Sequence, residues 1–116
     1  MSGDAPEDPL KVLSDLASDA HALIQQNHAA INPVVEVRRG MRDNGIPADA
    51  MTIDCLNTRR RILLILHDGE PGLLLYNFGS LDEEAGVEFE RKPLRELTVT
   101  TLHDWMRDYF REGRSH

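Results

Sequence analysis

The side chains best suited to ligand binding or catalysis lie around one predicted hairpin. Arg59 and Arg61 stand near the start of its first strand, and His67 and Asp68 stand at its end. A guanidinium binds phosphate or carboxylate oxygens through paired hydrogen bonds, and an imidazole titrates near neutral pH. Around one mouth of a sheet, these side chains would form a site for a small ligand. Carboxylates in turns more often cap backbone N–H groups, so a structural role for His67 and Asp68 is the simpler interpretation.

Two short arginine clusters, at 38–42 and 59–61, extend this candidate site. They could converge on a phosphate or on an acidic partner. Against this, successive residues of a strand point to opposite faces, so Arg60 would leave the group, and no glycine-rich phosphate loop accompanies the arginines. The complete candidate set for ligand or anion binding is Arg38, Arg42, Arg59, Arg61, His67 and Asp68.

The other histidines and the single cysteine are interpreted as structural. His103 and Asp104 open the last predicted helix, where the helix dipole favours a carboxylate. His21 and His28 are seven residues apart on one helix, about 10 Å along its axis, which is too far for one ion. Cys55 is predicted to face inward, whereas a nucleophile would need exposure and a base. We therefore assign no catalytic residue, metal site or cofactor, and the sequence leans away from an enzyme.

Length and composition predict one α+β domain over residues 1–116. A chain of 13.1 kDa is too short to form separate cores, and 41% hydrophobic residues suffice for a single core. With one cysteine and an acidic rather than basic start, a cytoplasmic location is expected. The net charge of −7 argues against nucleic acid, and the apolar runs are too short for a membrane helix. Flexible ends are expected at 1–8 and 112–116.

Hydrophobic periodicity predicts two helices, then an antiparallel meander of four to five strands, and then one C-terminal amphipathic helix. The first helix is expected over 8–31, with Asp8 as its cap and Pro9 at its first position. The second is expected over 33–44. A strand at 34–38 is the alternative, because three valines favour extended chain.

The strands and the last helix follow from changes in this period. Strands are expected from Met51 and over 60–67, 72–78, 87–91 and 94–99. Pro71 and Gly72 predict a type II turn, because proline presets its φ and glycine accepts a positive one. Thr100 or Thr101 is expected to cap the last helix. Its apolar stripe consists of Leu102, Trp105, Met106, Tyr109 and Phe110.

The predicted hairpin is apolar on both faces, because residues 62–66 and 73–76 lack alternation. An antiparallel sheet usually keeps one face in water. A second copy of the chain would shield the extra face, since two-fold homodimers are the commonest soluble oligomers. Alternatively, the second helix or the N-terminal residues could close it, or a lipid, a metabolite or a partner helix could bind there. Self-association is assigned to Leu64, Leu66, Leu74 and Tyr76.

The sequence thus favours a small, acidic, cytoplasmic protein that acts as a non-catalytic protein-interaction or adaptor module and forms a homodimer. A protein partner, but neither nucleic acid nor a membrane, is expected. The alternative is a binding protein or an enzyme that holds a small ligand or an anion with the arginine, histidine and aspartate side chains at the hairpin mouth.

Overall fold

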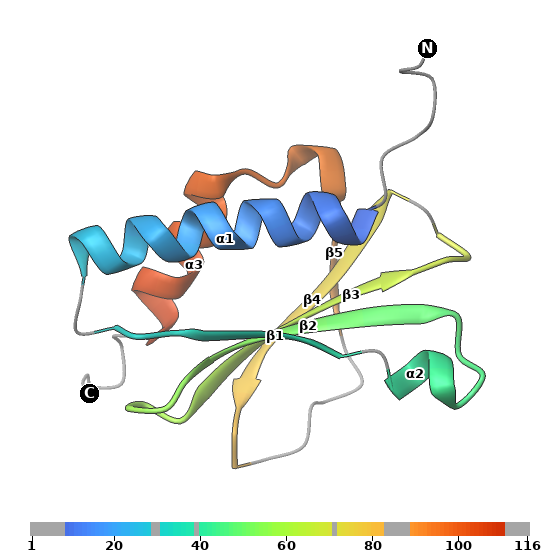
Figure 1. Cartoon of the computed structure of the whole chain (residues 1–116), viewed down its shortest axis with the longest axis horizontal. Helices are drawn as coiled ribbons and strands as arrows, with labels where there is room; N and C mark the ends of the chain where they lie inside the picture. The colour runs from blue at the N-terminus through green and yellow to red at the C-terminus, as the bar shows by residue number, and fades with distance from the viewer. Residues whose placement is uncertain (1–8, 29–30, 39, 71, 83–88, 111–116) are drawn as a thin grey trace.

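A five-stranded antiparallel sheet packs against two helices, Pro9–Asn27 (α1) and Val99–Phe110 (α3), as Figure 1 shows. The strands are β1 (Val34–Arg38), β2 (Ala48–Cys55), β3 (Arg60–His67), β4 (Leu73–Ser80) and β5 (Glu90–Pro93). Their order in the sheet is their order in the chain, so the predicted α+β meander is confirmed. The computed structural model describes residues 9–28, 31–38, 40–70, 72–82 and 89–110. The flexible ends predicted at 1–8 and 112–116 lie outside these ranges.

Helix α1 begins at Pro9, the first helical position that the sequence predicts, while the predicted cap Asp8 is outside the described residues. It ends at Asn27 rather than at residue 31. Ile31 is nevertheless buried, at 7% exposure, so it joins the core from the connection rather than from the helix. One stripe of α1 is buried, as the spacing predicts: Leu10, Leu13, Ala17, Ala20 and Ile24.

The second predicted helix, 33–44, is wrong, and its alternative is correct. Residues Val34–Arg38 form β1, which pairs antiparallel with β2 in the register Val35 to Ile53. Only Gly40–Asp43 is helical, as the single-turn helix α2. The valines are β-branched and favour a pleated strand. Pairing with β2 also gives this segment backbone hydrogen bonds to a neighbouring strand, which a short isolated helix would lack.

Strands β2, β3 and β4 form the centre of the sheet. Strand β2 starts at Ala48, three residues before the predicted start, and all eight of its residues are buried. The turn between β3 and β4 matches its prediction at Gly72, which has a φ of +85°. The N–H of Leu73 donates to the Glu70 carbonyl at 3.1 Å and closes that turn. Pro71 is outside the described residues.

The last third of the chain departs from the predicted strands. Strand β5 covers Glu90–Pro93, and of the predicted strand 87–91 only residues 89–91 are described. The predicted extension at 94–99 is wrong, because Leu94–Glu96 forms a 3-10 turn and α3 begins at Val99. The cap of α3 is Thr98, whose Oγ1 accepts the Thr101 N–H at 3.0 Å. The cap thus lies two or three residues earlier than predicted.

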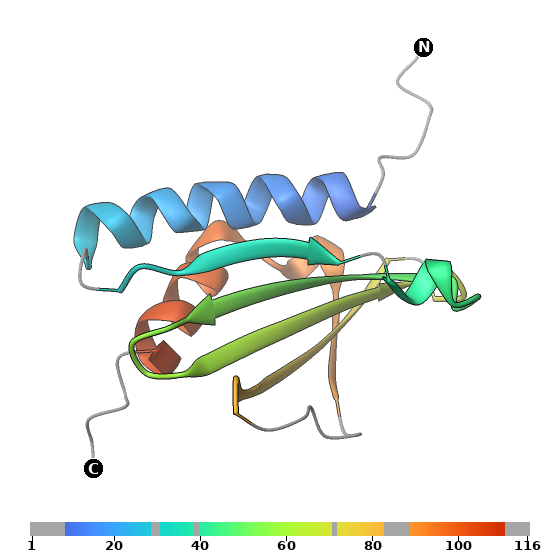
Figure 2. The ribbon, with the colours of Figure 1, turned by 60° about the horizontal axis from the view of Figure 1, so that its bottom comes forward.

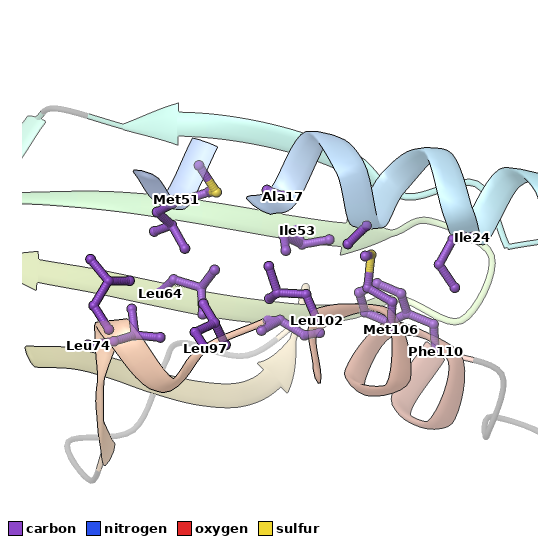
Figure 3. Packing of buried hydrophobic residues seen from close by; sticks show 14 of the residues in the cluster. Ala17, Ile24, Met51, Ile53, Leu64, Leu74, Leu97, Leu102, Met106 and Phe110 are labelled. Atoms are coloured by element: carbon purple, nitrogen blue, oxygen red, sulfur yellow. The ribbon is translucent and has the colours of Figure 1, made fainter. Parts of the chain in front are cut away.

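The core lies between the sheet and the two long helices. Figures 2 and 3 show α1 and α3 on the same side of the sheet, with side chains from both helices and from the strands meeting between them. Residues of one parity point into this layer, such as Ile53 of β2 and Leu64 of β3, and neither is exposed. From α3 the core receives Leu102, Met106 and Phe110. We call this covered side the helix face and the opposite side the open face.

Candidate functional site

The predicted hairpin mouth does not gather its four side chains. Arg61 lies opposite Asp54 near the start of β3, and His67 lies opposite Ala48 at its end. Six residues at about 3.3 Å each separate the two positions by about 20 Å. Arg59 belongs with Arg61 at one end of the sheet, and Asp68 belongs with His67 at the other. The expectation of one site formed by all four is therefore wrong.

At the His67 end, Arg42 lies between two carboxylates. Its Nε and Nη2 donate to the two Asp49 oxygens at 2.6 and 3.1 Å. Its Nη1 and Nη2 donate to the Asp68 oxygens at 2.9 and 2.8 Å. One guanidinium thus makes two bidentate pairs, which join α2, β2 and the turn after β3. The side chain of Asp49 is only 8% exposed, so Arg42 also balances a buried negative charge.

These contacts set the electrostatics of that end. The hydrogen bonds from Arg42 hold the pKa of Asp68 below its ordinary value of 3.8. The same bonds, to Asp68 and then Asp49, raise the pKa of Arg42. A hollow of about 200 Å³ lies beside them, and its lining includes His67 and Glu70. Since Arg42 already binds two carboxylates, the hollow offers a paired ion cluster of net negative charge rather than an open cation for an anion.

At the other end of the sheet the arginines are paired as well. Arg61 donates to both oxygens of Asp54, at 2.7 and 3.0 Å, and these bonds raise the pKa of Arg61. The position of Asp54 near arginines 59–61 in the sequence predicts a surface pair across the sheet, and the structure has this pair, although Asp54 is buried at 8% exposure. Arg59 donates to Asp82 at 2.7 and 3.2 Å and lowers the pKa of that carboxyl.

Arg38 completes the set from the edge strand β1. Its Nη2 donates to Glu36 at 2.8 Å, and its Nε reaches the hydroxyl of Thr52 at 3.4 Å. Every arginine of the candidate set thus contacts a carboxylate of this chain. The described arginines of both clusters hold strands and turns together, and apart from Asp54 their carboxylate partners were missed by the sequence reasoning.

The remaining chemical candidates have the structural surroundings that the sequence indicates. Cys55 is a buried free thiol, at 2% exposure. His21 Nε2 lies 2.9 Å from the Pro33 carbonyl oxygen, and His103 Nδ1 lies 3.1 Å from Asp104. Among the described residues, no group of three or more His, Cys, Asp or Glu side chains is arranged to hold a metal ion.

The residues assigned to self-association lie on the wrong side of the sheet. Leu64, Leu66 and Leu74 are at most 7% exposed, in the core beneath the helices. Tyr76 also packs against that core and stacks on Trp105, with ring centroids 4.6 Å apart. These four side chains pack within the chain itself, because they lie on the helix face of the sheet. The apolar residues of the other parity form what we call the open-face patch: Leu63, Ile65, Leu73 and Leu75.

A partly exposed aromatic cluster was missed by the sequence reasoning, which placed Trp105 and Tyr109 in the core. Phe78 of β4 packs on both, with ring centroids 5.4 and 5.2 Å apart. Both α3 rings are only half-buried, and Phe78 is 37% exposed. The signal was available in the sequence, because Phe78 shares the parity of Leu74 and so must face α3 near the end of β4.

Comparisons with known proteins identify no relative: no family model, no curated protein and no solved structure matches this chain. Within the described ranges, neither long helix has the length and apolar character needed to cross a membrane.

Proposed function

We propose that this protein is a non-catalytic interaction module that self-associates through the open face of its sheet, with a second copy of the chain as the occupant. The observation that carries the proposal is the open-face patch itself. Its four large aliphatic residues, Leu63 and Ile65 of β3 and Leu73 and Leu75 of β4, project from the side opposite α1 and α3. No described helix packs over them (Figure 2).

The surroundings of the patch make it suitable for a flat contact. Along most of the open face, β2 contributes small side chains, Ala48, Ala50 and Thr52, which are at most 5% exposed, and Asp54 follows them near the end of the strand. Beside them lie Leu63 opposite Thr52 and Ile65 opposite Ala50. The paired charges Asp54 and Arg61 border this surface. An apolar centre with a charged border is the usual anatomy of a protein interface.

The size of the face supports a second copy of the chain. Three strands of eight residues and two shorter ones, at spacings of about 4.8 and 3.3 Å, give a flat area of roughly 500 Å². A standard interface buries roughly 800 Å² per partner, so a contact of that size would use the whole open face together with its borders. In a two-fold dimer the same patch is buried on both copies. The open face can therefore be covered by a second copy of itself, without a different partner.

The alternative of an anion-binding protein has no specific support in this geometry, because the candidate arginines are paired with carboxylates. A cytoplasmic location remains part of the proposal and is supported by the single, buried thiol of Cys55.

The test compares two isoleucine substitutions by sedimentation velocity. Ile65→Lys places a charge in the open-face patch, and we expect the complex to dissociate while far-UV circular dichroism stays unchanged. Ile46→Lys is the matched control, because Ile46 is 45% exposed and lies outside the strands. It should keep the wild-type mass. If Ile65→Lys disturbs the fold, Leu75→Thr is the milder replacement on the adjacent strand. A folded open-face variant that keeps the wild-type dimer would refute the proposal.

A further inference from the structure

The aromatic cluster of Phe78, Trp105 and Tyr109 lines a shallow, open hollow at the end of β4 that the self-association proposal does not use. The three rings belong to the helix face, so a ligand here would not compete with a second copy on the open face. The hollow has a volume of about 250 Å³ and is lined by the three rings and Asp108. Its size suits one compact group rather than a drug-sized ligand.

The rings are arranged at steep angles to one another. Phe78 meets Trp105 edge to face, at an interplanar angle of 87°, and meets Tyr109 at 53°. Tyr76 stacks on Trp105 with ring centroids 4.6 Å apart, so one face of the indole is already covered. Tyr109 donates its hydroxyl to the Gly79 carbonyl at 2.7 Å, which fixes the ring between α3 and β4. The rings that line the hollow are therefore held in place by packing and by one partly buried hydrogen bond.

The chemistry of these walls favours a cation with little need for hydrogen bonds. The face of an aromatic ring is negative and attracts cations, and the guanidinium of Arg60 already lies 4.9 Å from the Tyr109 centroid. Asp108 adds a carboxylate, which also accepts hydrogen bonds from Arg107 at 2.8 and 3.3 Å. A primary ammonium would need several acceptors, whereas a quaternary ammonium needs none.

We propose that this hollow binds a quaternary ammonium group, held by the aromatic rings of Phe78, Trp105 and Tyr109 and by the carboxylate of Asp108. The probe is choline, compared with 3,3-dimethylbutan-1-ol, which has the same shape without the charge. Trp105 is the only tryptophan of the chain, so its fluorescence reports binding at this hollow directly. At constant ionic strength, choline should change this fluorescence in a saturable way and bind at least about five-fold more tightly than the alcohol.

Two matched pairs of variants locate the site. Phe78→Leu keeps an apolar side chain but removes a ring face, and it should weaken choline binding about two- to five-fold. Phe89→Leu, outside the residues that line the hollow, should bind choline like the wild type. Asp108→Asn should weaken binding to a similar degree. Asp104→Asn should not, although Asp104 also contacts Arg107, at 3.2 Å.

Each outcome decides the proposal. Equal affinity for choline and the neutral alcohol would show a plain apolar hollow and overturn it, as would the absence of any saturable response to choline. Equal effects of Asp108→Asn and Asp104→Asn would also overturn the assigned role of Asp108. Circular dichroism of each variant shows that a lost response is not due to unfolding.

Discussion

Two neighbouring leucines of β4 should respond very differently to truncation, because they point to opposite faces of the sheet. Leu74 is fully buried beneath the helices, at 0% exposure, whereas Leu75 is half-buried in the open-face patch. Removing a fully buried leucine side chain costs about 2–5 kcal/mol, since it loses apolar burial and leaves a cavity. Truncating Leu75 should lower the free energy of unfolding of the isolated chain by about 1 kcal/mol, because solvent and neighbouring side chains can fill the space that it leaves.

The assay is thermal unfolding of Leu74→Ala and Leu75→Ala at a concentration where the chain is monomeric. For a domain of this length, 1 kcal/mol corresponds to about 4 °C, so Leu74→Ala should lower the Tm by about 8–20 °C and Leu75→Ala by about 4 °C. Leu75→Ala should also weaken the dependence of the Tm on protein concentration. Equal losses for the two variants, or a larger loss for Leu75→Ala in the monomer, would refute the assignment of faces.

Three further outcomes follow from single contacts. Arg42 lowers the pKa of Asp68 in the folded chain, so the Arg42–Asp68 pair stabilises the fold above the ordinary pKa of 3.8, and this stabilisation is lost as the pH falls through the lowered folded pKa. Arg42→Gln should therefore reduce the fall in the urea unfolding midpoint between pH 6 and pH 2. An unchanged dependence of the midpoint on pH would contradict this. Thr98→Ala should cost about 1 kcal/mol in urea unfolding, because it removes the acceptor for the Thr101 N–H, while Thr100→Ala should cost less. Gly72→Ala should destabilise by about 1 kcal/mol, because its φ is +85°, whereas Gly40→Ala in α2 should be neutral or stabilising; equal unfolding midpoints would show that the turn does not require glycine.

The elements that the sequence predicted best are those with a strong local signal, either a periodic apolar stripe or a distinctive turn sequence. Helix α1, with its stripe from Leu10 to Ile24, and the β3–β4 hairpin with Gly72 are local patterns that tertiary packing reinforces. The segment Val34–Arg38 was assigned incorrectly because its apolar spacing suits both periods over so few residues. Pairing with β2 stabilises the strand over the helix. Such pairing is a non-local interaction, so a local sequence pattern does not reveal it.

The candidate sites were harder to predict because they depend on which residues face each other across the sheet. The apolar hairpin indicated that both faces of the sheet carry large apolar residues, but an uninterrupted apolar run does not show which alternate residues face the helices. Leu64 and Leu74 were therefore assigned to the wrong face. Most of the arginines were likewise assigned without their carboxylates, because Asp68 and Asp82 become neighbours of Arg42 and Arg59 only when the meander forms.

The central claim, that a second copy covers the open face, is tested most directly by light scattering of the untagged wild-type chain over a dilution series. We predict a mass that rises with concentration to about twice 13.1 kDa, and that falls to 13.1 kDa on dilution. A mass that stays at 13.1 kDa at every concentration would contradict the claim.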